Sequence, residues 1–449
     1  MGTRRQFVKK GSFLMAGMGA SLVFPMELLA SIRKNVSPND KIQVGLIGCK
    51  GMGFSDLSSM LKNSEVEVVA LCDVDENVLQ QRTADLEKAG IKKPKWYSDY
   101  RKLLEDKDID IAIIGTPDHW HCLLLVDAID AGKDVYCEKP IANSIAECDV
   151  MLGKVNTSDR MVQIGQWQRS QPHFVDAINY VHSGKLGQIR LAKTWAYQGW
   201  MKSIPPVPDS PVPAGVDYKM WLGPAPDGPF NKNRFHFDFR WFWDYAGGLM
   251  TDWGVHLIDY ALYGMKASTP KSVMAMGGKF AYPNDAAETP DTLQTVYEFD
   301  GFSLLWEHAT GIDGGNYGRN HGIAFIGNNG TLVLDRGGWE VIPENDRPHW
   351  SQDNGPKIEP VPLQQVDANG LDLHTTNFLD AVKSRDKTIL NAPIKVGYDA
   401  AVVSHMGNIA YKTGERLFWD AYQGQFTNTE ANAHLAKAYH NGWELPQVG

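Results

Sequence analysis

Short apolar runs alternate with stretches of helical periodicity in the part of the chain that begins at Lys41. Uninterrupted apolar runs are typical of strands buried on both faces of a parallel sheet, because helices cover each face. The alternation predicts an α/β domain over residues 41–156. We expect its strands at residues 42–47, 67–72, 110–115 and 133–137, and helices through about 61, over 119–131 and from 144 onward.

Beyond residue 161 the apolar positions alternate with polar ones. Asp300-Gly301 and Asn329-Gly330 each separate two such alternating runs, which is typical of antiparallel hairpins. We therefore predict an α+β domain over residues 161–449, with a largely antiparallel open sheet whose free face can meet a ligand or a partner subunit. A long loop is expected over residues 340–370, followed by helices that begin at Asp372 and Val396.

Residues 1–30 have the pattern of a twin-arginine signal peptide. The Arg4-Arg5 pair is followed by Phe7 and then by an apolar stretch over residues 13–24. No later run approaches the roughly 20 apolar residues that a membrane helix needs. We expect cleavage near Ala30, export to the periplasm, and no membrane span in the mature chain.

Composition places the 449-residue chain among globular proteins, with 43% hydrophobic and 22% charged residues. Its 44 basic and 53 acidic side chains give a net charge of -9, and no basic run follows the N-terminus, so we expect no nucleic-acid partner. The cysteines lack the paired spacing of a zinc site. We expect no bound metal and five buried thiols, at Cys49, Cys72, Cys122, Cys137 and Cys148.

A glycine-rich turn follows the first predicted strand and opens the first helix, which is the context of a dinucleotide-binding fingerprint. Small residues there let a pyrophosphate approach the N–H groups at the helix N-terminus. Counted from Gly48, the motif has Lys50 in place of its middle glycine, so either Lys50 as a cation or Gly51 by close approach could make this contact. The predicted cofactor turn comprises Gly48, Cys49, Lys50, Gly51 and Met52.

Asp73 ends the second predicted strand. A carboxylate at this position accepts hydrogen bonds from both ribose hydroxyls and repels a 2′-phosphate. The sequence therefore predicts a Rossmann domain that binds NAD in preference to NADP.

Two further motifs resemble the Gfo/Idh/MocA oxidoreductase family, which includes glucose–fructose oxidoreductase and inositol dehydrogenase. They are Thr116-Pro117-Asp118-His119-Trp120-His121 and Glu138-Lys139-Pro140, each placed after a predicted strand. The resemblance covers nearly all of the chain after Lys41. It implies that Lys139 lies beside the nicotinamide. Further cofactor contacts are expected from Thr116, Pro117, His119, His121 and Glu138.

Residues 247–259 are expected to be helical, which places Asp252, His256 and Asp259 on one face. Carboxylates there could orient the imidazole and set its pKa, as a general base requires. On spacing alone, a solvated Asp–His pair is the simpler interpretation. The resemblance implies instead that Asp252 and His256 form the family's second catalytic motif. We therefore predict Lys139, Asp252 and His256 as catalytic and substrate-binding residues.

Tryptophans are frequent around this segment, and flat rings beside polar groups suit the faces and hydroxyls of a sugar. Most of these rings are expected in the core, with one or two at the ligand. The remaining candidate substrate contacts are Arg169, Trp195 and His321, although Arg169 and His321 could instead satisfy buried polar groups. The resemblance also implies a homo-oligomer, since relatives often pair through the open sheet.

Three functions remain open. The first is NAD-dependent hydride transfer from a ring hydroxyl of a sugar, glycoside or cyclitol, such as C3 of a glucoside. The second, found among exported relatives of the family, is glycoside cleavage through transient oxidation, which returns the cofactor unchanged. Lys139 and His256 serve both of these reactions. The third is a sugar-binding protein without catalysis, in which substitution of these two residues leaves ligand affinity nearly unchanged.

Overall fold

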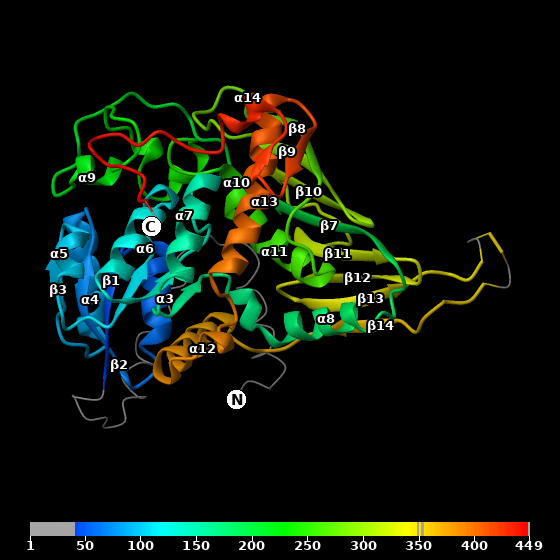
Figure 1. Ribbon diagram of the computed structural model, residues 1–449, viewed down its shortest axis with the longest axis horizontal. Coiled ribbons are helices and arrows are strands. Elements are labelled where there is room, and N and C mark those ends of the chain that lie inside the picture. Colours follow the sequence, from blue (N-terminus) through cyan, green and yellow to red (C-terminus); the bar gives the residue numbers. More distant parts are fainter. Residues whose placement is uncertain (1–40, 348–349, 352–353, 448–449) are drawn as a thin grey trace, which may run out of the picture.

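The computed structural model describes residues 41–347, 350–351 and 354–447. The predicted signal peptide, residues 1–30, lies outside the described residues. Figure 1 shows two sheets side by side, with the long helix α13 (Ile394–Thr413) between them. Among the described residues, no helix combines the length and the apolarity that crossing a membrane requires.

The first domain is built on a six-stranded sheet of order β3-β2-β1-β4-β5-β6, in which every neighbouring pair is parallel. This doubly wound order binds ligands at the carboxyl ends of the strands, where the order reverses between β1 and β4. The predicted α/β fold is thereby confirmed. The sixth strand lies beyond residue 156. The strands are β1 Ile42–Ile47, β2 Val66–Cys72, β3 Lys95–Tyr97, β4 Ile111–Ile114, β5 Asp134–Cys137 and β6 Val162–Ile164.

Helices cover both faces of this sheet, which explains why its strands are uninterrupted apolar runs. Along β4, Ile111 and Ile113 belong to one buried cluster, whereas Ala112 and Ile114 belong to the other. The alternation follows from the two-residue period of a strand. The helices of the domain are α3 Gly51–Met60, α4 Glu76–Lys88, α5 Tyr100–Leu104, α6 His121–Asp130 and α7 Ile145–Asn156.

The second domain contains a ten-stranded sheet of order β14-β13-β12-β11-β7-β10-β9-β8-β15-β16. Only the β7–β10 pair is parallel, so the predicted, largely antiparallel sheet is confirmed. Both predicted hairpins are present, as β9–β10 and β11–β12. The strands are β7 Ile189–Gln198, β8 Ser272–Gly278, β9 Thr292–Phe299, β10 Phe302–Thr310, β11 His321–Gly327, β12 Gly330–Asp335, β13 Gly338–Pro343, β14 Val361–Gln364, β15 Leu417–Asp420 and β16 Gln425–Phe426.

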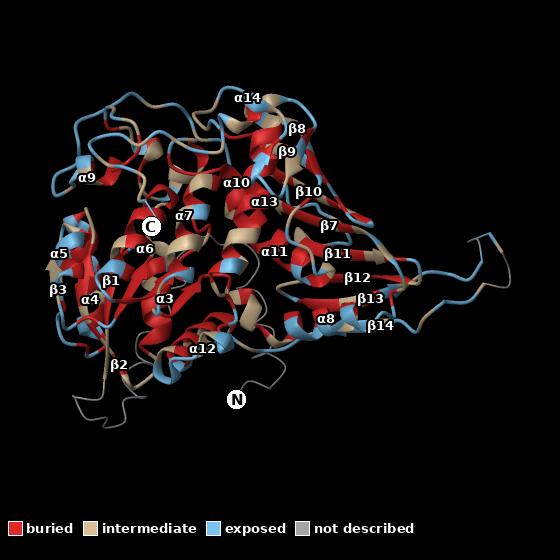
Figure 2. Ribbon diagram, in the orientation of Figure 1, coloured by how far each residue is buried: buried red, intermediate tan, exposed pale blue. Residues whose placement is uncertain are grey.

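The prediction of a long loop over residues 340–370 is wrong, because this stretch contributes two strands. β13 and β14 pair antiparallel at the edge of the sheet, and the described residues between them project from it and are largely exposed (Figure 2). Pro362 lies in β14, the edge strand, where proline is tolerated, and Pro343 is the last residue of β13. The predicted restarts are confirmed by α12 (Gly370–Ser384) and α13.

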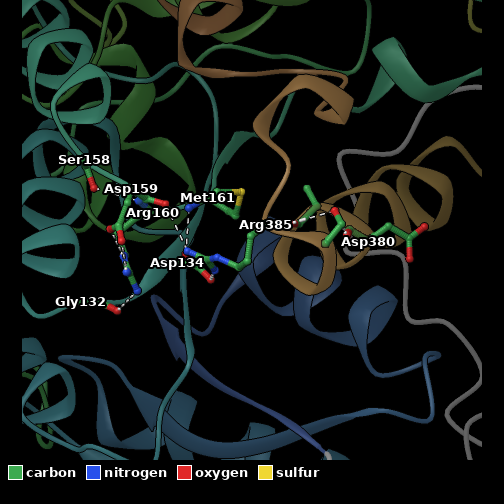
Figure 3. Close-up of polar contacts among 10 residues, drawn as sticks. Gly132, Asp134, Ser158, Asp159, Arg160, Met161, Asp380 and Arg385 are labelled. Carbon is green, nitrogen blue, oxygen red and sulfur yellow. Dashed lines mark hydrogen bonds and ion pairs between the residues drawn. The ribbon is translucent and has the colours of Figure 1, made fainter.

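Helix α12 belongs to the second half of the chain but packs on the first domain. Its Asp372 accepts hydrogen bonds from Lys62 of the loop after α3 (2.7 Å) and from Ser59 (2.7 Å). At its other end Arg385 contacts Asp134, which also accepts a hydrogen bond from the Met161 N–H (2.8 Å; Figure 3). These contacts fix the amino edge of the first sheet, where β5 and β6 begin, against α12 of the second half of the chain.

Candidate active site

The glycine-rich turn is tightly packed at one end and open at the other. Gly48 has a φ of 85°, and a Cβ there would lie 2.7 Å from the backbone of Gly115, so only glycine fits. Gly51 has a φ of 53°, and a Cβ on it would contact nothing within 4 Å. The open position is therefore where a pyrophosphate can approach the backbone.

Helix α3 begins beside that open position without a side-chain cap and without an acidic residue in its first turn. Unpaired N–H groups and the positive end of the helix dipole favour an anion there. Lys50 is the N-cap residue and its side chain is exposed, as is that of Met52. Cys49 departs from the expected cofactor contacts, because its thiol is buried and its N–H donates to Asp73.

Asp73 holds the turn together with both carboxylate oxygens. Oδ2 accepts the Cys49 N–H (2.8 Å) and Oδ1 accepts the Asp75 N–H (3.0 Å). Burial raises the pKa of Asp73 to about 6 despite these hydrogen bonds. Each oxygen keeps a lone pair for a ribose hydroxyl. The turn, the uncapped helix and this carboxylate together fit a bound dinucleotide.

A segment of the second domain lies along the same edge. Gly215 O accepts the Glu76 N–H (2.9 Å), and the Asp217 N–H donates to Val74 O (2.8 Å). His236 Nε2 lies 2.9 Å from Asp75 Oδ2. Residues beside Asp73 are therefore fastened to a chain segment that comes from the other domain.

The two histidines of the Thr116–His121 motif contact backbone carbonyls. His121 spans Pro140 O (2.7 Å) and Thr116 O (2.9 Å), and His119 Nε2 lies 3.1 Å from Trp221 O. Both rings are buried. His121 joins the loops after β4 and β5, and His119 joins the loop after β4 to Trp221. Thr116 differs, because its buried hydroxyl has no partner among the described residues. Pro117 precedes the short helical turn Asp118–Trp120.

The side chain of Glu138 contacts the backbone of Lys139, the next residue of the motif. Its side chain is buried, and burial raises its pKa. Oε2 accepts the N–H of Lys139 (3.3 Å), whereas Oε1 is buried without a partner among the described residues. Glu138 thus holds the backbone of Lys139 through a buried hydrogen bond.

Lys139 and Asp252 meet although 113 residues separate them in the chain. Lys139 follows β5, and its Nζ donates to Asp252 O (2.8 Å) and to Asp252 Oδ1 (3.1 Å). Arg240 Nε lies 3.5 Å from the same carboxylate oxygen. Burial alone would raise the pKa of Asp252, but Lys139 and Arg240 outweigh it and lower the pKa to about 2. Asp252 is therefore ionised and anchors the lysine at the carboxyl edge of the first sheet.

The expected single helix over residues 247–259 is wrong in one respect. It breaks at Trp253 into α10 (Gly248–Asp252) and α11 (Gly254–Met265). Asp259 pairs with Arg169 (Nε–Oδ2, 2.8 Å), which also stacks on Tyr263. Arg169 therefore satisfies a buried carboxylate, the second of the two roles considered for it.

His256 is buried, and no carboxylate orients it, contrary to expectation. Its Nδ1 has no hydrogen-bond partner among the described residues. Burial lowers its pKa well below the ordinary value, and the nearby charges of Lys139 and Arg336 lower it further. The imidazole is therefore neutral near pH 7 and able to accept a proton.

Trp195 and His321 lie on opposite faces of the second sheet. Trp195 is fully buried in a small cluster with Ala324 and Val333, and its indole N–H donates to Arg319 O (2.8 Å). A substrate contact is excluded by this placement, because the two-residue period turns Trp195 away from the helices that carry His256. His321 faces the site: it stacks edge-on against Trp253 (4.9 Å), and its buried Nε2 is unpartnered.

Two arginines in the site were not identified from the sequence. Arg240 lies in a short helical turn, His236–Trp241, and Arg336 lies between β12 and β13. Arg336 stacks on Trp253, with its guanidinium carbon 4.7 Å from the ring centre. In the sequence, Arg336 stands out only as a charged residue before the Gly337-Gly338 turn. Because a loop was expected over residues 340–370, strand β13 and the hairpin that carries Arg336 to the site were not predicted.

All five cysteines are buried and free, as predicted.

Comparison with known proteins covers both domains. Residues 42–166 match the oxidoreductase family model with an NAD-binding Rossmann fold (GFO_IDH_MocA), and residues 188–330 match the C-terminal alpha/beta domain of the same family. Inositol 2-dehydrogenase of Salmonella typhimurium is 39% identical over 150 residues, which are 33% of this chain and 43% of that protein.

A second relative has a different activity. Alpha-N-acetylgalactosaminidase of Shewanella oneidensis is 27% identical over 201 residues, which are 41% of this chain and 44% of that protein. The matches thus span less than half the length of these curated relatives.

A solved structure of levoglucosan dehydrogenase, in complex with NADH and levoglucosan, superposes on 84% of this chain and 99% of its own with a TM-score of 0.62. At 19% identity it shows the common fold. The two family matches together cover more than half of the chain, in the order and at the positions of the two observed domains. The chain therefore belongs to the Gfo/Idh/MocA oxidoreductase family and carries that family's NAD-binding Rossmann domain.

Proposed function

We propose that this protein transfers a hydride between a ring carbon of a sugar, glycoside or cyclitol and NAD. The observation that carries the proposal is the meeting of Lys139, Asp252 and His256 at the carboxyl edge of the Rossmann sheet. That edge is where the fold binds its cofactor. The curated relative named a 2-dehydrogenase of inositol acts on a ring hydroxyl, which agrees with this choice of reaction.

Bound NAD supplies the hydride acceptor. His256 is the general base: it is neutral and buried, and it accepts the proton of the substrate hydroxyl as the ring C–H bond breaks. Lys139 donates a hydrogen bond to the hydroxyl oxygen, where negative charge develops. Asp252 holds the Lys139 ammonium in place through two contacts. We propose NAD over NADP because a 2′-phosphate would meet the carboxylate of Asp73.

Glycoside cleavage through transient oxidation is the second candidate. The chain segment around Gly215 and Asp217 contacts Glu76 and Val74 beside Asp73, the predicted ribose contact. A segment that covers the ribose site in this way favours a cofactor that stays bound through the reaction. The relative named an N-acetylgalactosaminidase supports the same reaction class. Lys139 and His256 would act in the first, oxidative step of either reaction.

Product analysis distinguishes the candidates. The protein with NAD is incubated with a panel of free sugars, cyclitols and chromogenic glycosides, and the products are identified by mass spectrometry. Oxidised sugar with an equal amount of reduced cofactor supports net dehydrogenation. Release of the chromophore without net reduction supports cleavage. Binding without any oxidised or cleaved product overturns both and leaves a sugar-binding protein.

A further inference from the structure

Arg336 lies between two tryptophan rings at the edge of the proposed site. Its guanidinium carbon is 4.9 Å from the ring centre of Trp167 and 4.7 Å from that of Trp253. Trp253 is the residue between Asp252 and the helix of His256. Stacking from both rings fixes the plane of the guanidinium and so fixes the direction of its N–H groups.

No carboxylate forms an ion pair with this guanidinium among the described residues, and Asp252 acts on it only at longer range. The neighbouring Asp335 pairs with Arg319 (2.9 Å), and the Nε of Arg336 is buried without a hydrogen-bond acceptor. Two other arginines that stack on aromatic rings differ from Arg336, because each also holds a carboxylate: Arg169 pairs with Asp259, and Arg416 contacts Glu298. A desolvated cation without a partner is costly to keep, so an anion that binds there gains a preformed receptor.

The groups around Arg336 add to this positive potential. Lys139 and Arg240 share the single carboxylate of Asp252. Asp118 contributes little negative charge, because burial raises its pKa to about 8. His321 presents a buried, unpartnered Nε2 to the same space. Three cationic side chains thus face the ionised carboxylate of Asp252 and the buried Glu138, whose negative charge is reduced because burial raises its pKa to about 7.

We propose that Arg336 binds an oxyanion substituent of the substrate, so that the protein acts on acidic sugars, either uronates or sulfated sugars. The inference rests on the proposed function and names its substrate class. A planar guanidinium donates two parallel hydrogen bonds to a carboxylate or a sulfate. A neutral sugar of the same shape would leave the buried Nε of Arg336 without an acceptor.

The test compares three glycosides with the same aglycone: a glucoside, the corresponding glucuronide, and the glucoside sulfated at the same carbon. The full chain loaded with NAD is assayed for kcat/KM on each. The wild-type protein is expected to prefer one acidic glycoside over the neutral one by about 10- to 100-fold, the range of a charged hydrogen-bonded contact. The better acidic glycoside identifies the carboxylate or the sulfate as the bound group.

Variants assign that preference to Arg336. Arg336→Gln is expected to reduce the acidic-to-neutral ratio of kcat/KM by about 10-fold or more, whereas Arg336→Lys retains part of it. Arg416→Gln is the matched control, since Arg416 also stacks on a ring, Phe418, but lies at the far edge of the second sheet. A merely structural role for Arg336 would lower all rates together and leave the ratio unchanged.

Binding, followed by tryptophan fluorescence, separates this inference from the proposed function. Preferential binding of an acidic glycoside without turnover supports the role of Arg336 and overturns the hydride transfer. Turnover without preference for an acidic glycoside overturns the role of Arg336 alone. The absence of both binding and turnover overturns both. If Arg336→Gln does not fold, the preference of the wild-type protein still decides the substrate class.

Discussion

The cofactor turn and the catalytic cluster lie at the same edge of one sheet but are built in opposite ways. The turn uses backbone from residues that are close in sequence, and its requirements fall on Gly48, Gly51 and Asp73. The cluster uses side chains from separate segments, so that Lys139 meets Asp252 and His256 only after both domains have formed. We expect cofactor binding by the turn to survive most side-chain substitutions, whereas a single substitution in the cluster should abolish most of the activity.

The largest effect is expected at His256. Replacing His256 with Asn removes the proton acceptor, and kcat/KM should fall by about 10²- to 10⁴-fold in steady-state assays. His182→Asn is the control, because His182 lies at the end of α8 (Pro172–His182) and contacts a carbonyl away from the site. A fall in kcat/KM of less than about 10-fold is too small for the loss of a general base and contradicts the role of His256.

Lys139→Met should be almost as damaging. The variant removes the hydrogen bond to the oxygen that gains charge, and we expect kcat to fall by about 10²- to 10³-fold. Asp252 then loses one of the two cations that lower its pKa, so its pKa should rise. Lys154→Met, which removes an ammonium paired with Asp130 on the surface of the first domain, controls for loss of charge. Unchanged kcat in Lys139→Met would separate the lysine from the chemistry.

Asp73→Asn examines the turn through its one charged side chain. The amide oxygen can accept only one of the two backbone N–H groups, and the ribose loses a charged hydrogen bond, so the Kd for NAD should rise by about 10-fold or more by calorimetry. Affinity for NADP should change less, because the repulsion of its 2′-phosphate is relieved. Asp159→Asn, which removes an exposed partner of Arg160 away from the turn, serves as control. Equal losses for NAD and NADP would contradict the ribose contact.

Two alanine substitutions test whether the turn is packed at one end and open at the other. Gly48→Ala should lower the free energy of unfolding by about 2–4 kcal/mol, because its Cβ meets the Gly115 backbone and its φ is positive. Gly51→Ala should cost about 1–2 kcal/mol, from φ alone. Urea denaturation without NAD measures both. Equal losses would mean that the space at Gly51 is not open.

The smallest expected effect is the contribution of His256 to the pH dependence of kcat/KM. The pKa of His256 lies well below its ordinary value of 6.5, through burial first and through Lys139 and Arg336 next. A lowered pKa keeps the imidazole neutral as the pH falls through 6.5, so His256 should contribute no decline in kcat/KM there. Asp73 and Glu138, with pKa values of about 6 and about 7, titrate alike in the wild-type protein and in His256→Asn. A decline centred on the ordinary histidine pKa, absent from His256→Asn, would show that the site is more solvated than its burial indicates.

The same contrast explains what the sequence could predict. The turn and Asp73 are contiguous with the first two strands, so periodicity and the glycine pattern located them. Lys139 and His256 were located by resemblance, whereas the placement of Asp252 against Lys139 depends on how α10 ends at Trp253. The helical period carried no sign of that break.

Other misses arise from strand pairing over long separations. Trp195 was expected at the ligand, but the register of β7 with β11 turns it to the other face of the sheet. Arg336 reaches the site because β12 and β13 return across that sheet, and β13 was expected to be loop. Local sequence patterns predict whether a segment is helix or strand. Which face of a strand points to the site depends on its pairing with strands that are distant in the sequence.

The most direct test of hydride transfer follows the bound nicotinamide during a single turnover with a sugar deuterated at the ring carbon. The reaction should produce reduced nicotinamide, lasting or transient, that carries the deuterium, and the Lys139→Met/His256→Asn double variant should produce none. This result is expected for net oxidation and for redox-neutral cleavage alike. Oxidised or cleaved sugar formed by the wild-type protein without deuterium on the nicotinamide would contradict the proposed reaction.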